Sequence, residues 1–333
     1  MYKQIKGFKM SISNKLKNKI LNNKDKSDNL GQELEDLKNE FEKYKNYNDK
    51  IITSNNLLFN KIFLDFEIKP KGVLKLTQEL CTKLLDFYVN VCKKYDLEYW
   101  IDYGNLLGAV RHEGFVPWDD DVDVGMMRAD SLKFNEIIEE EVKLHNLDDL
   151  IRLRFVRRIR ETRSPSFTEI SVYDGAIYAG IDVFPYDYVA NPPKNLKKEF
   201  KIAKKEYTKN VYNGMDKKEV IDNYYNSLNC SYEKQKYFLS SIEAPPIGRN
   251  GYKVSLFETD KVFPLGEIEF EGKTYACPRD PHYYIPKVYG DDYMKIPKVI
   301  RYHKRMDGLK RQENIEEKFK NFSERLDKAN SEF

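Results

Sequence analysis

Apolar residues recur at alternating spacings of four and three residues along positions 30–52. The series is Leu30, Leu34, Leu37, Phe41, Tyr44 and Ile51, with Asn48 as its one polar member. The residues between these positions are mostly Glu, Lys, Asp and Asn. Such a heptad pattern predicts an amphipathic helix that pairs in a coiled coil or docks on a larger domain. The pattern allows a homodimer without requiring one.

The remaining periodicity predicts an α+β fold. We interpret Asn55-Asn56 and Lys69-Pro-Lys-Gly72 as breaks before the main domain. Helical spacing follows at 73–95, 106–112, 130–145, 194–209, 216–228 and 311–330, and strand-like segments at 97–103, 119–126, 151–158, 168–173 and 180–184. This order predicts a small mixed sheet with surrounding helices. We therefore divide the chain into a basic tail (1–28), a helical coiled-coil segment with linker (29–70), a catalytic domain (71–310) and a charged helix (311–333).

Charge and composition narrow the function classes. The net charge is only +3, which argues against a nucleic-acid partner. The positive charge is concentrated in residues 1–26, which contain several lysines and a single acidic residue, Asp25. This segment is either a solvated tail or a basic amphipathic segment on an anionic membrane surface. No apolar run is long enough for a membrane span and no secretory signal is evident, so we expect a cytoplasmic protein, with peripheral contact to the inner membrane face through the tail as an option.

Four cysteines, Cys81, Cys92, Cys230 and Cys277, are widely spaced and form no zinc-type pattern. Cys81 and Cys92 fall within the apolar helical pattern of 73–95, so we expect reduced, buried thiols.

The most informative segment is Trp118-Asp-Asp-Asp-Val-Asp-Val-Gly125. On a strand, Asp119, Asp121 and Asp123 would share one face while Val122 and Val124 point into the core. Carboxylates gathered in this way repel each other unless a cation lies among them, and Mg²⁺ prefers such oxygen ligands. The alternation predicts a metal site, although a solvated acidic loop is the simpler alternative.

Two further segments add polar groups. Gly104 and Asn105 come where a predicted strand opens a short helix, so their backbone N–H groups can hold a phosphate, and Arg111 can neutralise its charge. Asp182 lies between Ile181 and Val183 on another predicted strand. We predict that Asp182 completes the metal site or accepts a proton from the acceptor as general base.

The run Asp102-Tyr-Gly-Asn-Leu-Leu-Gly-Ala-Val-Arg-His-Glu-Gly-Phe-Val-Pro-Trp-Asp-Asp-Asp-Val-Asp-Val-Gly125 closely resembles the signature of the LicD family, to which fukutin-related protein is distantly related. The segments 181–187 and 289–297, followed by Arg301 and His303, resemble later blocks of that family. The resemblance covers about residues 73–304.

The resemblance implies a nucleotidyltransferase-like fold and a phosphotransferase that moves phosphocholine or a phospho-alditol from a CDP-linked donor to a cell-surface glycan. It places the metal ligands for Mg²⁺, or Mn²⁺, on Asp121 and Asp123, with Asp119 beside them and Asp182 as the later carboxylate. We predict that Asp182 or Asp119 is the catalytic residue that accepts the hydroxyl proton, and that Arg301 and His303 are substrate-binding candidates. The acceptor would be a glycan or a lipid-linked glycan, and CMP would leave.

Three alternatives stay open. Asp121-Val-Asp123 is also a DxD motif of metal-dependent glycosyltransferases that use nucleotide sugars. However, the mostly helical residues before it lack the run of parallel βα units that those enzymes have. A transferase of the nucleotide itself would release pyrophosphate. A coiled-coil scaffold without activity is the non-enzymatic alternative.

Overall fold

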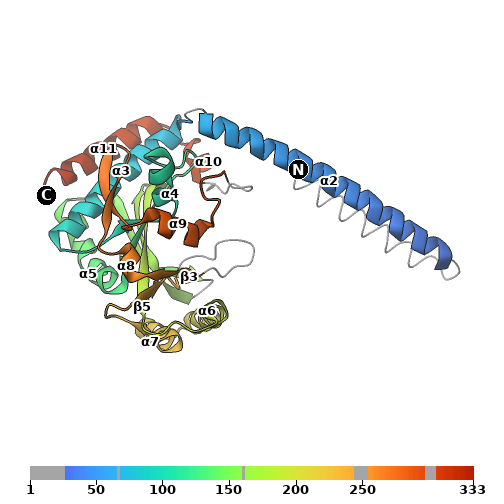
Figure 1. The fold of residues 1–333 in the computed structure, drawn as a ribbon. Coiled ribbons are helices and arrows are strands. Elements are labelled where there is room, and N and C mark those ends of the chain that lie inside the picture. The colour runs from blue at the N-terminus through green and yellow to red at the C-terminus, as the bar shows by residue number, and fades with distance from the viewer. Residues whose placement is uncertain (1–26, 66–67, 160–161, 244–253, 297–304) are drawn as a thin grey trace. The chain divides into compact units, whose positions relative to one another are not determined.

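The computed structural model describes residues 27–65, 68–159, 162–243, 254–296 and 305–333 (Figure 1). The chain divides into two compact units, Met1–Phe66 and Glu67–Phe333. The basic segment 1–26 lies outside the described residues, and so do residues 297–304, which include Arg301 and His303. No helix in the described part of the chain combines the length and hydrophobicity needed to cross a membrane.

The described part of the first unit is one long helix, α2 (Ser27–Asp65). The predicted break at Asn55-Asn56 is wrong, because the helix continues through both residues. Asparagine costs an α-helix far less than proline does. Here the side chain of Asn60 also donates to the Asn56 carbonyl at 2.7 Å, inside the helix. The heptad spacing continues beyond the predicted end through Leu58 and Ile62.

The second unit is built on a mixed sheet in the order β1-β2-β5-β4-β3, so the predicted α+β class is confirmed. β2 and β5 are parallel, while the other neighbours in this row are antiparallel. The strands are β1 (Trp100–Ile101), β2 (Val122–Met127), β3 (Ile151–Ile159), β4 (Thr162–Tyr173) and β5 (Ile177–Val189). The end of β5 also pairs with β6 (Cys230–Ser231) and β7 (Tyr237–Leu239), and β7 pairs with β8 (Leu256–Glu258). A separate hairpin contains β9 (Gly266–Phe270) and β10 (Lys273–Cys277).

Helices cover this sheet (Figure 1). α3 (Val73–Lys94) packs on β5, and α11 (Ile315–Asn330) lies along α3. The remaining helices are α4 (Tyr103–His112), α5 (Arg128–Leu144), α6 (Leu196–Tyr212), α7 (Lys217–Leu228), α8 (Thr259–Val262), α9 (Pro281–Tyr289) and α10 (Arg305–Leu309). Cys81 and Cys92 are free, buried thiols of α3, as predicted. Burial raises the pKa of each to about 12.

Several predicted boundaries differ from those of the structure, and two of the differences lie beside the predicted site. The short helix begins at Tyr103 rather than Leu106, because Asp102 caps it: its carboxylate accepts from the Tyr103 N–H at 2.7 Å. The acidic strand begins at Val122 rather than Asp119. The three acids before Val122 therefore form a loop that leads into β2.

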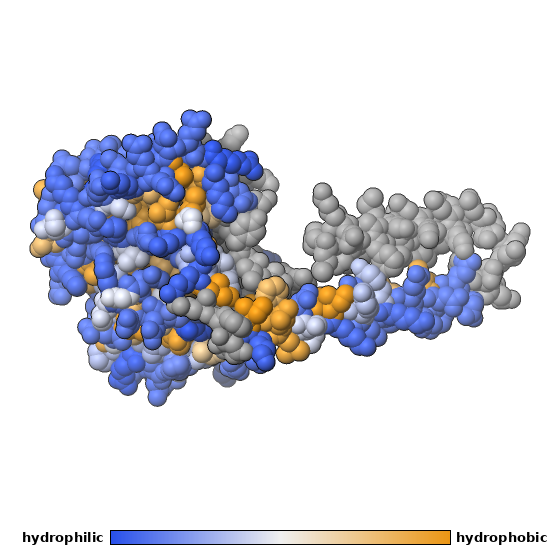
Figure 2. Space-filling view, turned by 90° about the horizontal axis from the view of Figure 1, so that it is seen from above, coloured by the Kyte–Doolittle hydropathy of each residue, from blue (hydrophilic) through white to orange (hydrophobic). Residues whose placement is uncertain are grey.

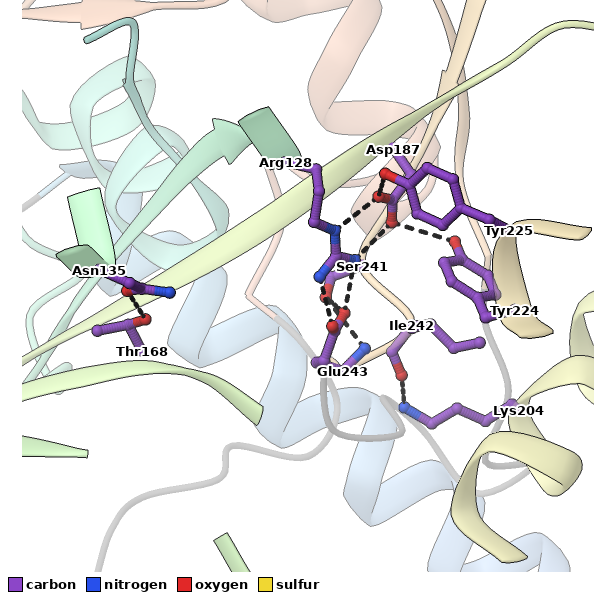
Figure 3. Close-up of polar contacts among 10 residues, drawn as sticks. All are labelled: Arg128, Asn135, Thr168, Asp187, Lys204, Tyr224, Tyr225, Ser241, Ile242 and Glu243. Atoms are coloured by element: carbon purple, nitrogen blue, oxygen red, sulfur yellow. Dashed lines mark hydrogen bonds and ion pairs between the residues drawn. The ribbon is translucent and has the colours of Figure 1, made fainter. Parts of the chain in front are cut away.

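A buried ion network joins the end of β5 to its surroundings (Figure 3). Arg128 donates to Asp187 at 2.8 and 2.7 Å and to Glu243 at 2.6 and 3.1 Å. Tyr225 and Tyr224 of α7 also donate to Asp187, at 2.6 and 3.2 Å. A buried guanidinium is tolerated when its charge and donors are matched in this way. The network therefore attaches α5 and α7 to β5 at the edge of a second, smaller core.

Candidate active site

Asp119, Asp120 and Asp121 form an acidic loop in which one carboxylate oxygen from each lies within 4.8 Å of the others. α3 holds the backbone of this loop. Gln78 donates its side-chain amide to the Asp119 carbonyl at 2.8 Å, and the Cys81 thiol lies 3.7 Å from the Asp120 carbonyl. The acids thus converge through loop contacts, and not through the alternation of a strand that the sequence predicted for Asp119 and Asp121.

α4 fixes the other side of the acidic loop. Asn105 is almost completely buried, its carbonyl oxygen accepts from the Asp123 N–H at 2.6 Å, and its amide donates to the Asp121 carbonyl at 3.2 Å. Gly104 lies against Asp119: a Cβ atom at this glycine would come within 2.4 Å of Asp119 Oδ2. These contacts make Gly104 and Asn105 the residues that position the acids. Their predicted phosphate contact stays a prediction.

A row of charged side chains crosses four neighbouring strands. Asp123 on β2 is the register partner of Asp182 on β5, which pairs in turn with Glu169 on β4. Glu169 pairs with Arg154 on β3, and their side chains form an ion pair at 3.0 Å. Register partners project to the same face of a sheet. The predicted third acid therefore comes directly beside Asp123.

Like charges shift the ionisation of this cluster. The pKa of Asp119 lies well above its ordinary range because burial disfavours the carboxylate and Asp121 and Asp120 add negative charge. The pKa of Asp123 is also raised, by burial first and then by the charges of Asp121 and Asp182. Such shifts are typical of carboxylates that share a site. Oxygen ligands gathered at this density suit a hard divalent cation such as Mg²⁺.

Arg305 on α10 is a site residue that the sequence analysis missed. Its Nε donates to Asp120 Oδ2 at 2.7 Å, a second nitrogen contacts the Asp120 carbonyl, and the guanidinium lies 3.6 Å from Asp121. Arg305 therefore neutralises charge at Asp120 and, at longer range, at Asp121. Asp119, Asp121 and Asp123 stay the acids that the sequence predicted for the site. The only signal in the sequence was the basic run Arg301–Arg305, too general to single out one residue.

Arg111 lies in the last turn of α4 and donates to the Tyr293 carbonyl at 2.9 Å. Burial lowers the pKa of its guanidinium. The contact links α4 to the segment 289–297, which the sequence analysis had identified as a separate block. The predicted phosphate contact of Arg111 is not tested by this arrangement, and neither are the roles of Arg301 and His303.

A buried chain of hydrogen bonds supports the start of α4. The Trp100 indole donates to the Tyr284 hydroxyl at 3.3 Å, Tyr284 donates to Tyr186 at 2.9 Å, and Tyr186 donates to Asp102 at 2.5 Å. Burial raises the pKa of Asp102 to about 6, against the lowering effect of these hydrogen bonds. Because Asp102 caps α4, this chain fixes the helix whose first turn holds the acidic loop.

The acidic loop, Asp123 and Asp182 lie within a range that matches a known family. Residues 96–218 match the family described as LicD/FKTN/FKRP, nucleotidyltransferase domain. The chain is 26% identical over 252 residues to the lipopolysaccharide cholinephosphotransferase LicD of Haemophilus influenzae, a match that covers 68% of this chain and 93% of that protein. It is 43% identical over 44 residues to the ribitol 5-phosphate transferase FKRP of mouse and of human, which is 13% of this chain and 9% of theirs.

Proposed function

We propose, from the membership of this chain in the LicD/FKTN/FKRP family, that it is a transferase of phosphorus-containing groups that moves a phosphorylated small alcohol to a glycan hydroxyl. The match to the cholinephosphotransferase supports phosphocholine as the transferred group, and the shorter match to the ribitol 5-phosphate transferases supports a phospho-alditol. The observation that carries the proposal is the register of Asp123 with Asp182 beside the acidic loop, inside the matched domain.

A divalent cation fits the acids of this site. Asp121 and Asp123, with Asp119 beside them, would hold Mg²⁺ or Mn²⁺. When bound, such a cation neutralises charge on a donor diphosphate and on the transferred phosphoryl group. The chain supplies the rest of the arrangement: Asn105 holds the backbone at Asp121 and Asp123, and Arg305 holds the carboxylate of Asp120.

Asp182 is our first choice for the residue that accepts the proton of the acceptor hydroxyl on a carboxylate oxygen. Its register partner on the neighbouring strand is Asp123. If Asp123 binds the cation, Asp182 would lie near the phosphoryl group that the hydroxyl attacks. Asp119 is the second choice. Its raised pKa favours the protonated carboxyl, which must lose its own proton before it can act as a base. Arg111, Arg301 and His303 remain candidates for contacts with donor phosphate or acceptor.

The donor is proposed to be CDP-linked, with CMP as the product that leaves. The test is a donor screen with purified full-length protein, Mg²⁺ and an acceptor glycan, using CDP-choline and CDP-ribitol against UDP- and GDP-sugars. We expect CMP release with a CDP-alcohol only. Turnover of a nucleotide sugar would support the DxD glycosyltransferase alternative, and pyrophosphate release would support transfer of the nucleotide itself.

Asp182→Asn should lose activity in this screen, while Asp222→Asn on the exposed face of α7 serves as the matched control. Full activity of Asp182→Asn would remove it as the proton acceptor. Loss of activity in both variants would point to general damage instead of a role at the site.

A further inference from the structure

α2 carries a continuous apolar seam that is longer than the heptads seen in residues 30–52. With Leu34 as position a, the a residues of the seam are Leu34, Phe41, Asn48, Asn55 and Ile62, and the d residues are Leu30, Leu37, Tyr44, Ile51 and Leu58. Several seam residues are exposed, with Leu34 at 44%, Phe41 at 42% and Leu58 at 58%. In Figure 2 the hydrophobic side chains of α2 gather toward its C-terminal end.

α2 is the one described element of the first unit, so no other described element of that unit covers this seam. At 39 residues the helix is about 58 Å long. Long amphipathic helices gain most of their stability from burying the apolar face, and not from helix propensity. The seam therefore needs a partner of comparable length and matching chemistry.

We propose that this partner is a second copy of the same chain, and that the two α2 helices pair as a parallel, in-register coiled coil. The charges beside the seam carry this choice. Glu33 and Glu40 are g residues, and Lys38 and Lys45 are the e residues five positions later. In a parallel coiled coil each g residue faces the e residue of the next heptad of the other helix. Glu33 then faces the partner's Lys38, and Glu40 faces the partner's Lys45.

Within a single chain these lysines have weaker alternatives. Lys38 pairs with Glu35 at 3.4 Å and Lys45 with Glu42 at 3.8 Å, both on the exposed surface of one helix. Exposed pairs at such spacing stabilise little and are readily exchanged. If Lys38 and Lys45 pair across the dimer instead, the loss of their pairs within one helix therefore costs little stability.

The polar seam residues also select the parallel arrangement. In register, Asn48 meets the partner's Asn48 and Asn55 meets the partner's Asn55, so each amide finds an amide. An antiparallel pair with the same overlap sets Asn48 against the partner's Tyr44 and Asn55 against the partner's Leu37. It also sets Lys45 against the partner's Lys45, a repulsive contact. A buried amide without a matching partner costs stability, so the antiparallel pair is disfavoured.

Parallel pairing would also affect catalysis. This part of the inference rests on the proposed function. The catalytic unit follows the C-terminal end of α2 in the sequence. Two catalytic units are then tethered at the same end of the coiled coil. A polymeric glycan acceptor can be engaged by both, which raises its effective concentration at each site.

Cysteine cross-linking of the full-length protein tests the arrangement. Leu34→Cys should form an intermolecular disulfide rapidly, because in-register pairing brings both copies of residue 34 together. Asn39→Cys, at an outward f position, is the matched control and should cross-link slowly. Antiparallel pairing would separate the two residues 34 by about 36 Å and place residue 34 beside the partner's Leu58. Cross-linking of a Leu34→Cys and Leu58→Cys mixture, without a Leu34→Cys homodimer, would overturn the proposal.

Charge exchange tests the same pairing without cysteine. In the double variant Glu33→Lys and Glu40→Lys, the new lysines would lie opposite the partner's Lys38 and Lys45. Because like charges repel, the dimer dissociation constant should rise about tenfold or more at low salt. The double variant Lys38→Glu and Lys45→Glu should be weakened in the same way. A mixture of the two variants should form heterodimers, because all facing charges are then opposite. Equal dimerisation of each variant alone would contradict the proposed register.

Sedimentation analysis decides whether a second copy covers the seam at all. The wild-type chain should be a dimer at micromolar concentration. A monomeric wild type would overturn the proposal. A chain shortened by residues 1–26 that dimerises when the full-length chain does not would identify the chain's own N-terminal segment as the covering element. None of these measurements depends on catalysis, so they stand apart from the donor screen.

Discussion

Asp123 of β2 and Asp182 of β5 are register partners in a parallel pair of strands, although they lie far apart in the sequence. Their carboxylates project from the same face of the sheet, next to the acidic loop of Asp119, Asp120 and Asp121. The charges of Asp121 and Asp182 help to raise the pKa of the buried Asp123, and those of Asp121 and Asp120 help to raise the pKa of the buried Asp119. The stability of the metal-free protein and the binding of a cation must therefore be coupled at this site, and the predictions below follow from that coupling.

Asp123→Asn should lower transferase activity by about 100- to 1,000-fold or more, because a carboxylate that stabilises transition-state charge would be lost. The same change should raise the melting temperature of the metal-free protein, since it removes a buried charge repelled by Asp121 and Asp182. Melting curves with EDTA and with Mg²⁺ or Mn²⁺ measure both effects. The wild type should gain stability from the cation and the variant should not. An equal gain in both proteins would exclude Asp123 as a ligand.

The raised pKa values of Asp119 and Asp123 predict a pH dependence of stability with a definite sign. Between the ordinary aspartate pKa near 3.8 and the raised folded-state pKa, the folded protein binds more protons than the unfolded protein. Their contribution to stability is therefore complete below pH 3.8 and is lost as the pH rises through the raised values. With EDTA, melting temperatures of the wild type and of Asp119→Asn, measured between pH 5 and pH 8, should converge toward acid and diverge toward pH 8. A constant difference would contradict the shift at Asp119.

Gly104→Ala should disable the site while leaving the fold intact. The added Cβ would come within 2.4 Å of Asp119 Oδ2, so the carboxylate has to move. Gly308→Ala in α10 is the matched control, because among the described residues no atom outside its own helix backbone lies within 4 Å of the added Cβ. Circular dichroism should find both variants folded, and the donor screen should find activity in the control alone. An active Gly104→Ala variant would mean that the position of Asp119 is unimportant.

Arg305→Met should destabilise the protein by about 3–5 kcal/mol, because it leaves the buried Asp120 without its partner. Combining it with Asp120→Asn should recover part of this loss, since the uncompensated charge is then removed. Denaturant titrations of the two single variants and the double variant give the coupling energy directly. Strictly additive losses would show that the ion pair contributes nothing specific to the loop.

The sequence determined the fold class and most of the elements. α3, α5, α6, α7 and α11 were predictable because each has an apolar stripe at helical spacing. β3, β4 and β5 were predictable as short strand-like segments, although β5 is buried along almost its whole length. The acids Asp119, Asp121, Asp123 and Asp182 also stood out in the sequence, since charge between valines or isoleucines has no simple role in a core. The run from Asp102 to Gly125 was long enough to show a resemblance to the LicD family, and residues 96–218 match the description of that family.

Only the tertiary structure decided how these residues meet. The observed start of α4 at Tyr103 depends on the cap by Asp102. The acids before Val122 form a loop whose backbone contacts Gln78 and Cys81 of α3. The sequence pattern did not show these contacts, because the contacts of Gln78 and Cys81 join residues from separate elements. Arg305 became a site residue only when α10 packed beside Asp120, more than 180 positions earlier in the chain. Local periodicity records which face of an element is buried, but it does not record which distant side chain that face will meet.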